Sequence, residues 1–326
     1  MSGSPVMSEH CVNGSRRRFL GAAMGGVCGV SAMKTLVAAE AASEADGAPG
    51  FRYALNMGTI RGQGLDLARE IDVAADAGYD AIEPWLGAIR GYVEKGGTTA
   101  DLKKRCEDRG ITVESAIGFA PWMSPDAGQR KAAFEAMRSD MDLVARIGGT
   151  RIAAPPAGAT SAENLDLAEI AQWYAQLLEL GAEMGVRPQL ELWGPSKTLH
   201  RIGEAAHVAA EAGRDDACLL LDVYHIYKGG SDFTGLGMLN GRRMFVFHMN
   251  DYPADPSREN ISDADRVYPG DGVAPMGIIL RTLYETGFRG VLSLELFNRE
   301  YWKQDATAVA KTGLAKMKAA VERAFS

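Results

Sequence analysis

Residues 135–154 read E-A-M-R-S-D-M-D-L-V-A-R-I-G-G-T-R-I-A-A and contain one complete step of the pattern that decides the fold. Apolar residues recur at helical spacing up to Ile147, and the Gly148 that follows is typical of a helix C-terminus. The short apolar run Arg151–Ala154 comes next and is typical of a buried strand. The stretch therefore predicts a helix, a tight cap and a strand in immediate succession.

The same step recurs along the chain, because helical patterns also end in glycine before an apolar run at Gly78, Gly110, Gly213 and Gly287. We predict strands at Tyr53–Asn56, Ala81–Pro84, Thr112–Ile117, Arg151–Ala154, Gln189–Leu192, Leu219–Val223, Phe245–His248 and Val291–Leu296. Eight strand–helix units predict an α/β fold, a (β/α)8 TIM barrel that forms a single domain over residues 49–326. A doubly wound open sheet is the alternative, but the N-M-G-T-I-R-G-Q-G after the first strand is a poor phosphate-binding loop.

Composition excludes several classes of protein. The chain has 326 residues, of which 46% are hydrophobic and 24% are charged, so it can form a large core. A net charge of −7 argues against a nucleic-acid partner, whose binding surface would be basic. The four cysteines (Cys11, Cys28, Cys106 and Cys218) form no C-x-x-C pair, so we expect neither a disulfide framework nor a thiolate metal site.

The N-terminus is typical of an export signal. S-R-R-R-F-L at 15–20 is followed by a weakly hydrophobic, glycine-rich stretch and then by V-A-A-E-A-A at 37–42. The paired arginines before Phe and Leu resemble the twin-arginine signal. We therefore expect residues 1–48 to be signal and linker, cleavage near Ala39–Ala42, and an exported, periplasmic protein. A basic leader without a targeting role is the alternative. Cys28 lacks a lipobox leucine, so we expect no stable membrane anchor.

Four consecutive predicted strands end in residues that can bind a metal. They are Glu191 in Q-L-E-L-W, Asp222 in L-L-L-D-V-Y-H, His248 in V-F-H-M-N-D and Glu295 in L-S-L-E-L-F. The carboxyl ends of barrel strands meet at one rim, where the catalytic groups of such barrels lie. Three carboxylates in an apolar cavity repel one another unless a cation neutralises them. Oxygen-rich ligands with one imidazole suit Mn²⁺, Mg²⁺ or Co²⁺. Each residue alone has a structural alternative, such as capping a helix or bonding a carbonyl.

With these motifs the chain resembles the xylose-isomerase-like TIM-barrel superfamily of metal-dependent sugar isomerases and epimerases. Its closest likeness within that superfamily is to inosose (2-keto-myo-inositol) isomerases, over nearly all of residues 51–326. The motifs that carry the resemblance are A-G-Y-D-A-I-E, L-E-L-W-G, L-L-L-D-V-Y-H, F-H-M-N-D, D-A-D-R-V-Y-P-G-D-G and L-S-L-E-L-F-N-R-E-Y-W. The resemblance implies one divalent metal bound by Glu191, Asp222, His248 and Glu295. Mn²⁺ is the ion we expect, with Mg²⁺, Co²⁺ or Zn²⁺ as alternatives.

The chain lacks residues that two groups of enzymes in this superfamily require, the ketohexose 3-epimerases and the endonucleases. Ketohexose 3-epimerases carry a further Glu after the strand-five ligand and an Arg after the strand-seven histidine, but this chain has W-G-P-S-K and M-N-D-Y-P-A there. This departure puts open-chain ketohexose epimerisation in doubt. The endonucleases of the superfamily need extra histidines to bind further metals. The predicted second and third strands of this chain end instead in E-P-W and I-G-F-A, so we do not expect a nuclease.

The predicted chemistry is proton transfer next to a carbonyl, through an enediolate, in a keto-cyclitol or keto-sugar. Glu191 and Glu295 come from strands on opposite sides of the Asp–His pair, so we expect them to be the base and the acid. A 3-keto-glycoside lyase, which acts by β-elimination, is an alternative on the same site. A non-catalytic sugar-binding barrel is an alternative from another class, but such a protein would be expected to lose a ligand or a catalytic carboxylate. We also expect a small-molecule partner and a possible homo-oligomer.

Further residues near the strand ends are candidates for substrate binding, each with a structural alternative. The candidates are His225, Arg266, Trp85, Trp193 and Glu83. His225 could instead orient a ligand, and Arg266 could instead pair with a carboxylate such as Asp271. The two tryptophans could instead pack in the core, and Glu83 could instead be a buried, paired acid.

Overall fold

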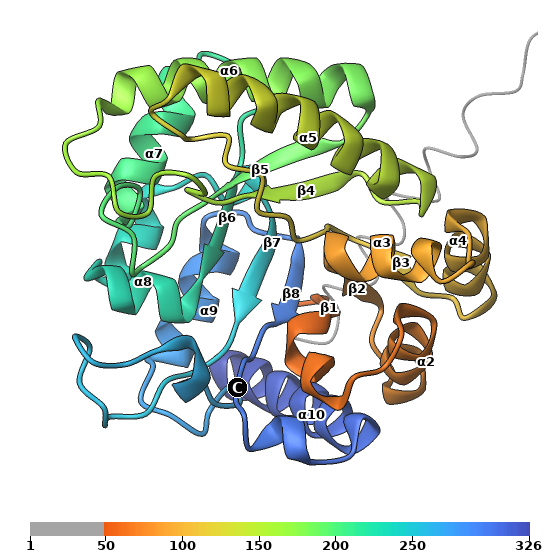
Figure 1. The fold of residues 1–326 in the computed structure, drawn as a ribbon. Helices are drawn as coiled ribbons and strands as arrows, with labels where there is room; N and C mark the ends of the chain where they lie inside the picture. Colours follow the sequence, from red (N-terminus) through yellow and green to blue (C-terminus); the bar gives the residue numbers. More distant parts are fainter. Residues whose placement is uncertain (1–48) are drawn as a thin grey trace, which may run out of the picture. The chain divides into compact units, whose positions relative to one another are not determined.

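The computed structural model describes residues 49–326, and the predicted export signal lies outside the described residues. Strands alternate with helices along this range (Figure 1). The strands are β1 (Arg52–Asn56), β2 (Ala81–Glu83), β3 (Thr112–Val113), β4 (Arg151–Ala154), β5 (Arg187–Glu191), β6 (Leu219–Asp222), β7 (Met244–Met249) and β8 (Val291–Leu294). The α-helices are α2 (Leu67–Ala77), α3 (Leu86–Glu94), α4 (Thr99–Asp108), α5 (Ala127–Arg146), α6 (Leu167–Met184), α7 (Ile202–Glu211), α8 (Val223–Gly229), α9 (Met276–Glu285) and α10 (Ala306–Phe325). The 3-10 helices are η2 (Met57–Gln63), η3 (Phe233–Met238), η4 (Gly241–Arg243), η5 (Asp263–Asp265) and η6 (Tyr301–Lys303).

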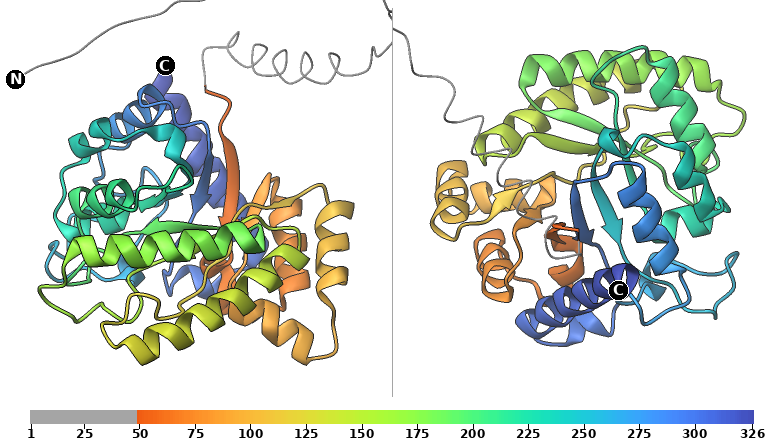
Figure 2. Two further views of the ribbon diagram at one scale, coloured as in Figure 1. Left: turned by 90° about the horizontal axis from the view of Figure 1, so that it is seen from above. Right: turned by 180° about the vertical axis from the view of Figure 1, so that it is seen from behind.

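All of these strands belong to one parallel sheet, in the order β3-β2-β1-β8-β7-β6-β5-β4. The first and last strands, β1 and β8, are therefore neighbours within the sheet. A parallel sheet is buried on both faces, and helices surround these strands in every view (Figures 1 and 2). This arrangement is that of a TIM barrel, as the sequence predicts.

The sheet closes through the residues that follow β3. The Ala116 N–H donates to the Arg151 carbonyl oxygen at 3.2 Å, and the Ala153 N–H donates to the Ala116 carbonyl oxygen at 2.9 Å. These two bonds join the segment after β3 to β4, and those strands stand at the two ends of the sheet order. The strand predicted at 112–117 is thus shorter than expected, because its last residues make this closure instead of a regular ladder.

The helix and strand of the opening stretch form as predicted. α5 begins after Asp126, whose side chain accepts a backbone N–H of the first turn. Met137, Met141 and Val144 are buried at four- and three-residue spacing, which places them on one face of the helix. Gly148 follows with φ of 90°, a conformation that favours glycine, and the chain then turns into β4.

Alternate residues of the strands produce an apolar layer with a polar layer above it. Leu220 of β6 and Val246 of β7 belong to a small apolar cluster that is separate from the main core. Two positions further along each strand are Asp222 and His248, which pair in register. His248 also pairs in register with Ser293 of β8. Strand periodicity and register therefore bring these polar side chains together at the carboxyl end of the sheet.

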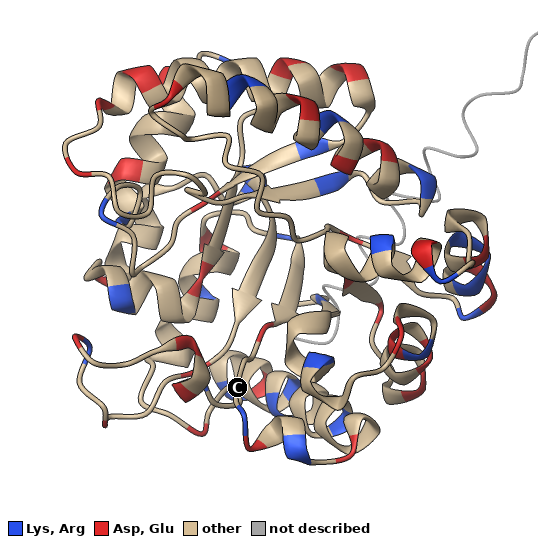
Figure 3. Cartoon of the chain, in the orientation of Figure 1, with Lys and Arg blue, Asp and Glu red and all other residues tan. Residues whose placement is uncertain are grey.

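Charged side chains lie mostly on the helices and loops around the sheet (Figure 3). Within residues 49–326, no helix combines the length and the apolar character needed to cross a bilayer.

Glu70 is a carboxyl group buried among the outer helices, away from the strand ends. It lies on α2 and is 4% exposed, and its Oε2 has no hydrogen-bond partner in the part of the chain that the structure describes. Burial, with Asp66 nearby, raises the pKa of Glu70 from 4.5 to about 8. The fold therefore prefers the protonated form. The resulting stabilisation is complete below pH 4.5 and is lost as the pH rises through 8.

Replacing Glu70 by Gln should stabilise the protein at alkaline pH, because the neutral amide removes the cost of a buried charge. We expect the free energy of unfolding to rise by on the order of 2 kcal/mol at about pH 9 and to change little at about pH 5. Chemical denaturation at the two pH values measures the difference. Glu211→Gln, at an exposed position of α7, is the matched control and should show no such pH dependence. A Glu70→Gln effect of equal size at both pH values would contradict the prediction.

Candidate active site

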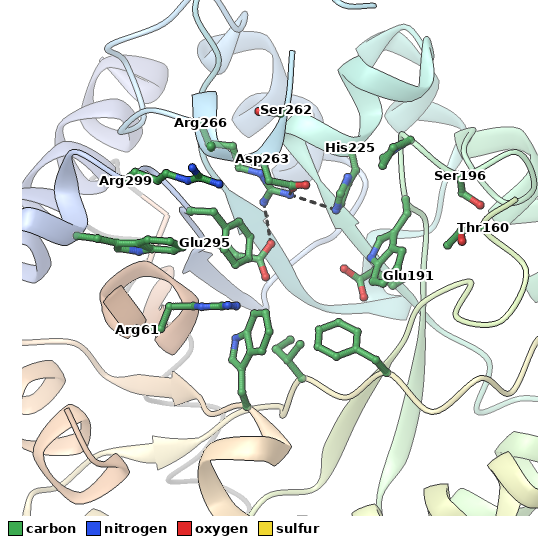
Figure 4. Close-up of a pocket in the computed structure, with 18 residues that line it drawn as sticks. Arg61, Thr160, Glu191, Ser196, His225, Ser262, Asp263, Arg266, Glu295 and Arg299 are labelled. Atoms are coloured by element: carbon green, nitrogen blue, oxygen red, sulfur yellow. Dashed lines mark hydrogen bonds and ion pairs between the residues drawn. The ribbon is translucent and has the colours of Figure 1, made fainter. Parts of the chain in front are cut away.

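A cavity of about 670 Å³ lies at the carboxyl ends of the strands (Figure 4). Its volume falls in the range of ligand pockets, roughly 300–1,000 Å³. Aromatic side chains form much of its wall: Trp85, Phe119, Trp193, Phe297 and Trp302. The ionisable side chains that line it are Arg61, Glu191, His225, Asp263, Arg266, Glu295 and Arg299. Apolar walls with a few convergent polar groups are typical of small-molecule sites.

Three side chains with metal-binding atoms converge in the interior beside this cavity. One ligand-type atom from each of Asp222, His248 and Glu295 lies within 4.8 Å of the others, and all three residues are buried. His248 Nδ1 is 3.2 Å from Glu295 Oε2 and 3.7 Å from Asp222 Oδ2. Three of the four predicted metal ligands are thus brought together from the ends of β6, β7 and β8.

The His248 ring is oriented by a residue beneath it. His248 Nε2 lies 3.0 Å from Glu83 Oε2, and the Ser293 hydroxyl donates to the same oxygen. A carboxylate in this position accepts the Nε2 proton and leaves the Nδ1 lone pair available. Nδ1 is buried and faces Glu295, and within residues 49–326 it has no hydrogen-bond partner. An orphaned imidazole nitrogen that faces two carboxylates fits a cation site.

Asp222 caps a helix and also belongs to the cluster of metal-binding atoms. Its Oδ1 accepts the His225 N–H at 2.8 Å and caps α8. Its Oδ2 accepts the Asn250 side-chain N–H at 2.8 Å and lies 3.0 Å from Arg266 Nη1. Capping therefore uses one oxygen, and the other oxygen faces the cluster.

Arg266 is almost fully buried and supplies positive charge to the carboxylates. Its Nη1 donates to Asp222 at 3.0 Å and to Glu295 at 2.8 Å, and its Nη2 pairs with Asp263. Arg266 therefore pairs with carboxylates, as the structural alternative expects, but not with Asp271, whose carboxylate pairs instead with a lysine of α10. Arg266 is nevertheless part of the cavity wall, so a substrate contact remains compatible with its position.

The two predicted catalytic carboxylates differ in protonation. Glu191 lies outside the three-residue cluster and faces Glu295 across the cavity (Figure 4). Burial raises the pKa of Glu191 to about 8, against the attraction of His248. Burial also disfavours the charged form of Glu295, but His248 and Arg266 hold its pKa below its usual range. At neutral pH, without a bound ion, Glu191 is therefore mostly protonated and Glu295 is ionised.

The cluster as a whole requires positive charge. Burial alone would lower the pKa of His248, but the carboxylates of Glu295 and Glu83 hold it well above its ordinary value. In the absence of an ion, an imidazolium and the Arg266 guanidinium therefore counter the acids.

The predicted substrate contacts fall into two groups. His225, Trp85 and Trp193 line the cavity. Glu83 does not, and its carboxylate is fully buried against His248. The position of Glu83 therefore does not support a substrate contact and agrees with the alternative of a buried, paired acid.

Four polar residues that hold this site together were not predicted from the sequence: Asn56, Asn250, Asp251 and Ser293. The Asn56 side chain donates to Glu295 at 3.0 Å and accepts the Trp85 indole N–H at 3.0 Å. Asn56 is the last residue of the first predicted strand, and Asn250 and Asp251 follow His248 directly. The positions of Asn56, Asn250 and Asp251 at or just after strand ends are the feature of the sequence from which they could have been predicted.

Asp251 fixes the loop that carries Arg266. Its Oδ1 accepts the Ala274 N–H and its Oδ2 accepts the Gly270 N–H, each at 2.9 Å. Its backbone also exchanges two hydrogen bonds with Val267, at 3.0 and 2.9 Å. The buried carboxylate therefore organises the loop that follows Arg266 along the chain.

Replacing Asp251 by Ala should loosen this loop, because the backbone N–H groups of Tyr252, Gly270 and Ala274 lose their acceptor. We expect the free energy of unfolding to fall by about 3 kcal/mol and the amides of residues 267–274 to exchange faster with deuterium. Denaturant titration and hydrogen exchange measure the two effects. The control is Asp232→Ala, which removes an exposed cap of η3 and should cost about 1 kcal/mol without affecting the loop. Unchanged exchange in the Asp251 variant would show that its carboxylate does not hold the loop.

Known proteins with similar sequences are enzymes. The chain is 26% identical over 266 residues to an inosose isomerase of Bacillus velezensis, an alignment that covers 80% of this chain and 94% of that protein. It is 25% identical over 255 residues to a 3-dehydroshikimate dehydratase of Pseudomonas aeruginosa, covering 77% of this chain and 39% of that protein.

A solved structure and a family model cover most of the described chain. The crystal structure of the IolI protein, described with a bound zinc atom, superposes with a TM-score of 0.78 at 24% identity, covering 85% of this chain and 100% of that one. The model of the family described as "Xylose isomerase-like TIM barrel" matches residues 71–320. The chain belongs to the xylose isomerase-like TIM barrel family.

Proposed function

We propose that the chain is a divalent-metal-dependent isomerase or epimerase of a keto-cyclitol or keto-sugar. The observation that carries the proposal is the convergence of Asp222, His248 and Glu295, with Glu191 facing them across an aromatic-walled cavity. A buried set of acids around an imidazole costs free energy unless positive charge compensates it, and a bound divalent ion would add such charge to that of Arg266.

Glu191, Asp222, His248 and Glu295 are the residues that would hold the ion. Three carboxylates and one imidazole are donors that suit Mn²⁺ first, with Mg²⁺, Co²⁺ or Zn²⁺ as alternatives. When bound, a divalent ion supplies positive charge that stabilises an oxyanion in the cavity.

The two facing carboxylates are placed for proton transfer. Glu295 is held ionised by Arg266, His248 and Asn56, so it can accept a proton from the carbon beside a carbonyl. Glu191 faces Glu295 across the cavity and can return a proton from the other side. In this proposal Glu295 is the base and Glu191 is the acid.

The names of the relatives agree with this type of chemistry. Isomerisation of a keto-polyol, epimerisation beside a carbonyl and dehydration of a β-hydroxy ketone all begin with removal of a carbon-bound proton. The relatives include an inosose isomerase and a dehydratase, and a site that removes such a proton serves either reaction. Ring ketones of the cyclitol and sugar class are the substrates we propose.

A 3-keto-glycoside lyase is the second candidate, because the cavity extends past the carboxylates to Phe119 and Trp302. Such a wall could hold the leaving group. The third hypothesis, a non-catalytic sugar-binding barrel, is disfavoured because all four acid and imidazole groups are present. Mass analysis of the product separates the first two, since elimination releases an aglycone whereas isomerisation conserves mass.

Export to the periplasm by the predicted twin-arginine signal is part of the proposal. That route transports folded proteins, so an enzyme of this kind could bind its metal before export. Assembly into a homo-oligomer also remains a prediction.

Glu295→Gln should abolish the exchange of substrate carbon-bound protons with solvent while the fold persists. We expect a loss of at least about 100-fold, because the amide cannot accept the proton. NMR in D₂O with a keto-inositol and added Mn²⁺ measures the exchange, and circular dichroism checks the fold. Glu163→Gln, at an exposed loop position, is the control. Exchange at the normal rate in the Glu295 variant would refute its role as base.

Glu83→Ala should weaken metal binding although Glu83 is no proposed ligand. Without its carboxylate, the His248 ring loses the acceptor that fixes its tautomer and orientation. We expect the Kd for Mn²⁺ to rise about 10- to 100-fold in isothermal titration calorimetry. Ser293→Ala keeps the His248–Glu83 contact and should have a smaller effect. Equal affinities in the wild type and Glu83→Ala would show that Glu83 does not support the site.

A further inference from the structure

The outer part of the cavity has a chemistry that proton transfer does not use. Arg61, Arg299 and Trp302 line it, and Figure 4 shows both guanidinium groups on the same side as Glu295. Ser196 lies on the other side of the cavity (Figure 4). The mouth is thus cationic on one side and neutral on the other.

Neither of these arginines forms an ion pair with the described part of the chain. Within residues 49–326, no carboxylate oxygen lies within 4.0 Å of the side-chain nitrogens of Arg61 or Arg299. Arg266 differs, because three carboxylates surround it. Two positive charges at the mouth are therefore available to a ligand.

Arg61 is held by aromatic rings in a way that leaves its donors free. Its guanidinium carbon lies 4.7 Å from the ring centre of Trp85 and 5.5 Å from that of Trp302. Trp302 is fixed in turn, because its indole N–H donates to the Gly58 carbonyl oxygen and its ring packs on Gly62, where a Cβ would come within 2.2 Å of a ring atom. Stacking engages the faces of a guanidinium but not its in-plane N–H groups. Arg61 is therefore oriented and still able to bind an oxyanion.

The cavity has a volume of about 670 Å³, which is larger than a single sugar or cyclitol ring. Arg61 and Arg299 line this cavity on the side of Glu295 (Figure 4). We infer that the substrate carries an oxyanion, a carboxylate or a phosphate, beyond the reacting ring, and that Arg61 and Arg299 bind it. The inference rests on the proposed function, because it identifies the class of substrate for that same site.

Unreactive ligands test the inference without relying on turnover. Calorimetry on the full chain with Mn²⁺ would compare methyl β-D-glucuronide, methyl β-D-glucoside 6-phosphate and neutral methyl β-D-glucoside. We expect at least one anionic ligand to bind about tenfold more tightly than the neutral one, and the better of the two identifies the oxyanion. The ratio should fall toward one in Arg61→Met and in Arg299→Met.

The control is Arg243→Met, at an exposed arginine outside the cavity, and it should keep the wild-type ratio. Equal binding of anionic and neutral ligands by the wild type would overturn the inference, as would a preference that survives both cavity variants. Proton exchange in a neutral keto-inositol tests the proposed function separately, so failure of one is distinguishable from failure of the other.

Discussion

The rest of the site depends on one electrostatic constraint: acids from adjacent strands meet where water is largely excluded. Asp222 and Glu295 lie beside His248, and Glu191 faces them across the cavity. Buried like charges are tolerated only when positive charge or hydrogen-bond donors compensate them. In the described structure this compensation comes from Arg266 and the imidazole, and a bound divalent ion would supply the same charge in a smaller volume.

The surrounding polar residues follow from the same constraint. Asn56 and Asn250 each donate to one of the clustered acids, and Glu83 sets the orientation of the His248 ring. Asp251 organises the loop that follows Arg266 along the chain. A few residues with ligand chemistry therefore require a larger set of residues whose part is to position them.

The barrel and its rim could be predicted because they follow from local periodicity. Glycine-capped helices before apolar runs identify the units, and residues at strand ends must share a rim, which brought Asp222, His248 and Glu295 together in the prediction. The partners of Arg266 could not be predicted in the same way, because η5 and the loop after it have no such periodicity. Arg266 pairs with Asp263 and not with the suggested Asp271. Glu83 likewise sits at a strand end, but only the register of the strands shows that it lies under His248.

The most direct test of a shared cation is anomalous X-ray diffraction from crystals of the protein grown with Mn²⁺. A shared cation should give a single strong anomalous peak between His248 Nδ1 and the carboxylate oxygens of Asp222 and Glu295. No peak there at saturating Mn²⁺, with Arg266 still bridging the two carboxylates, would contradict it.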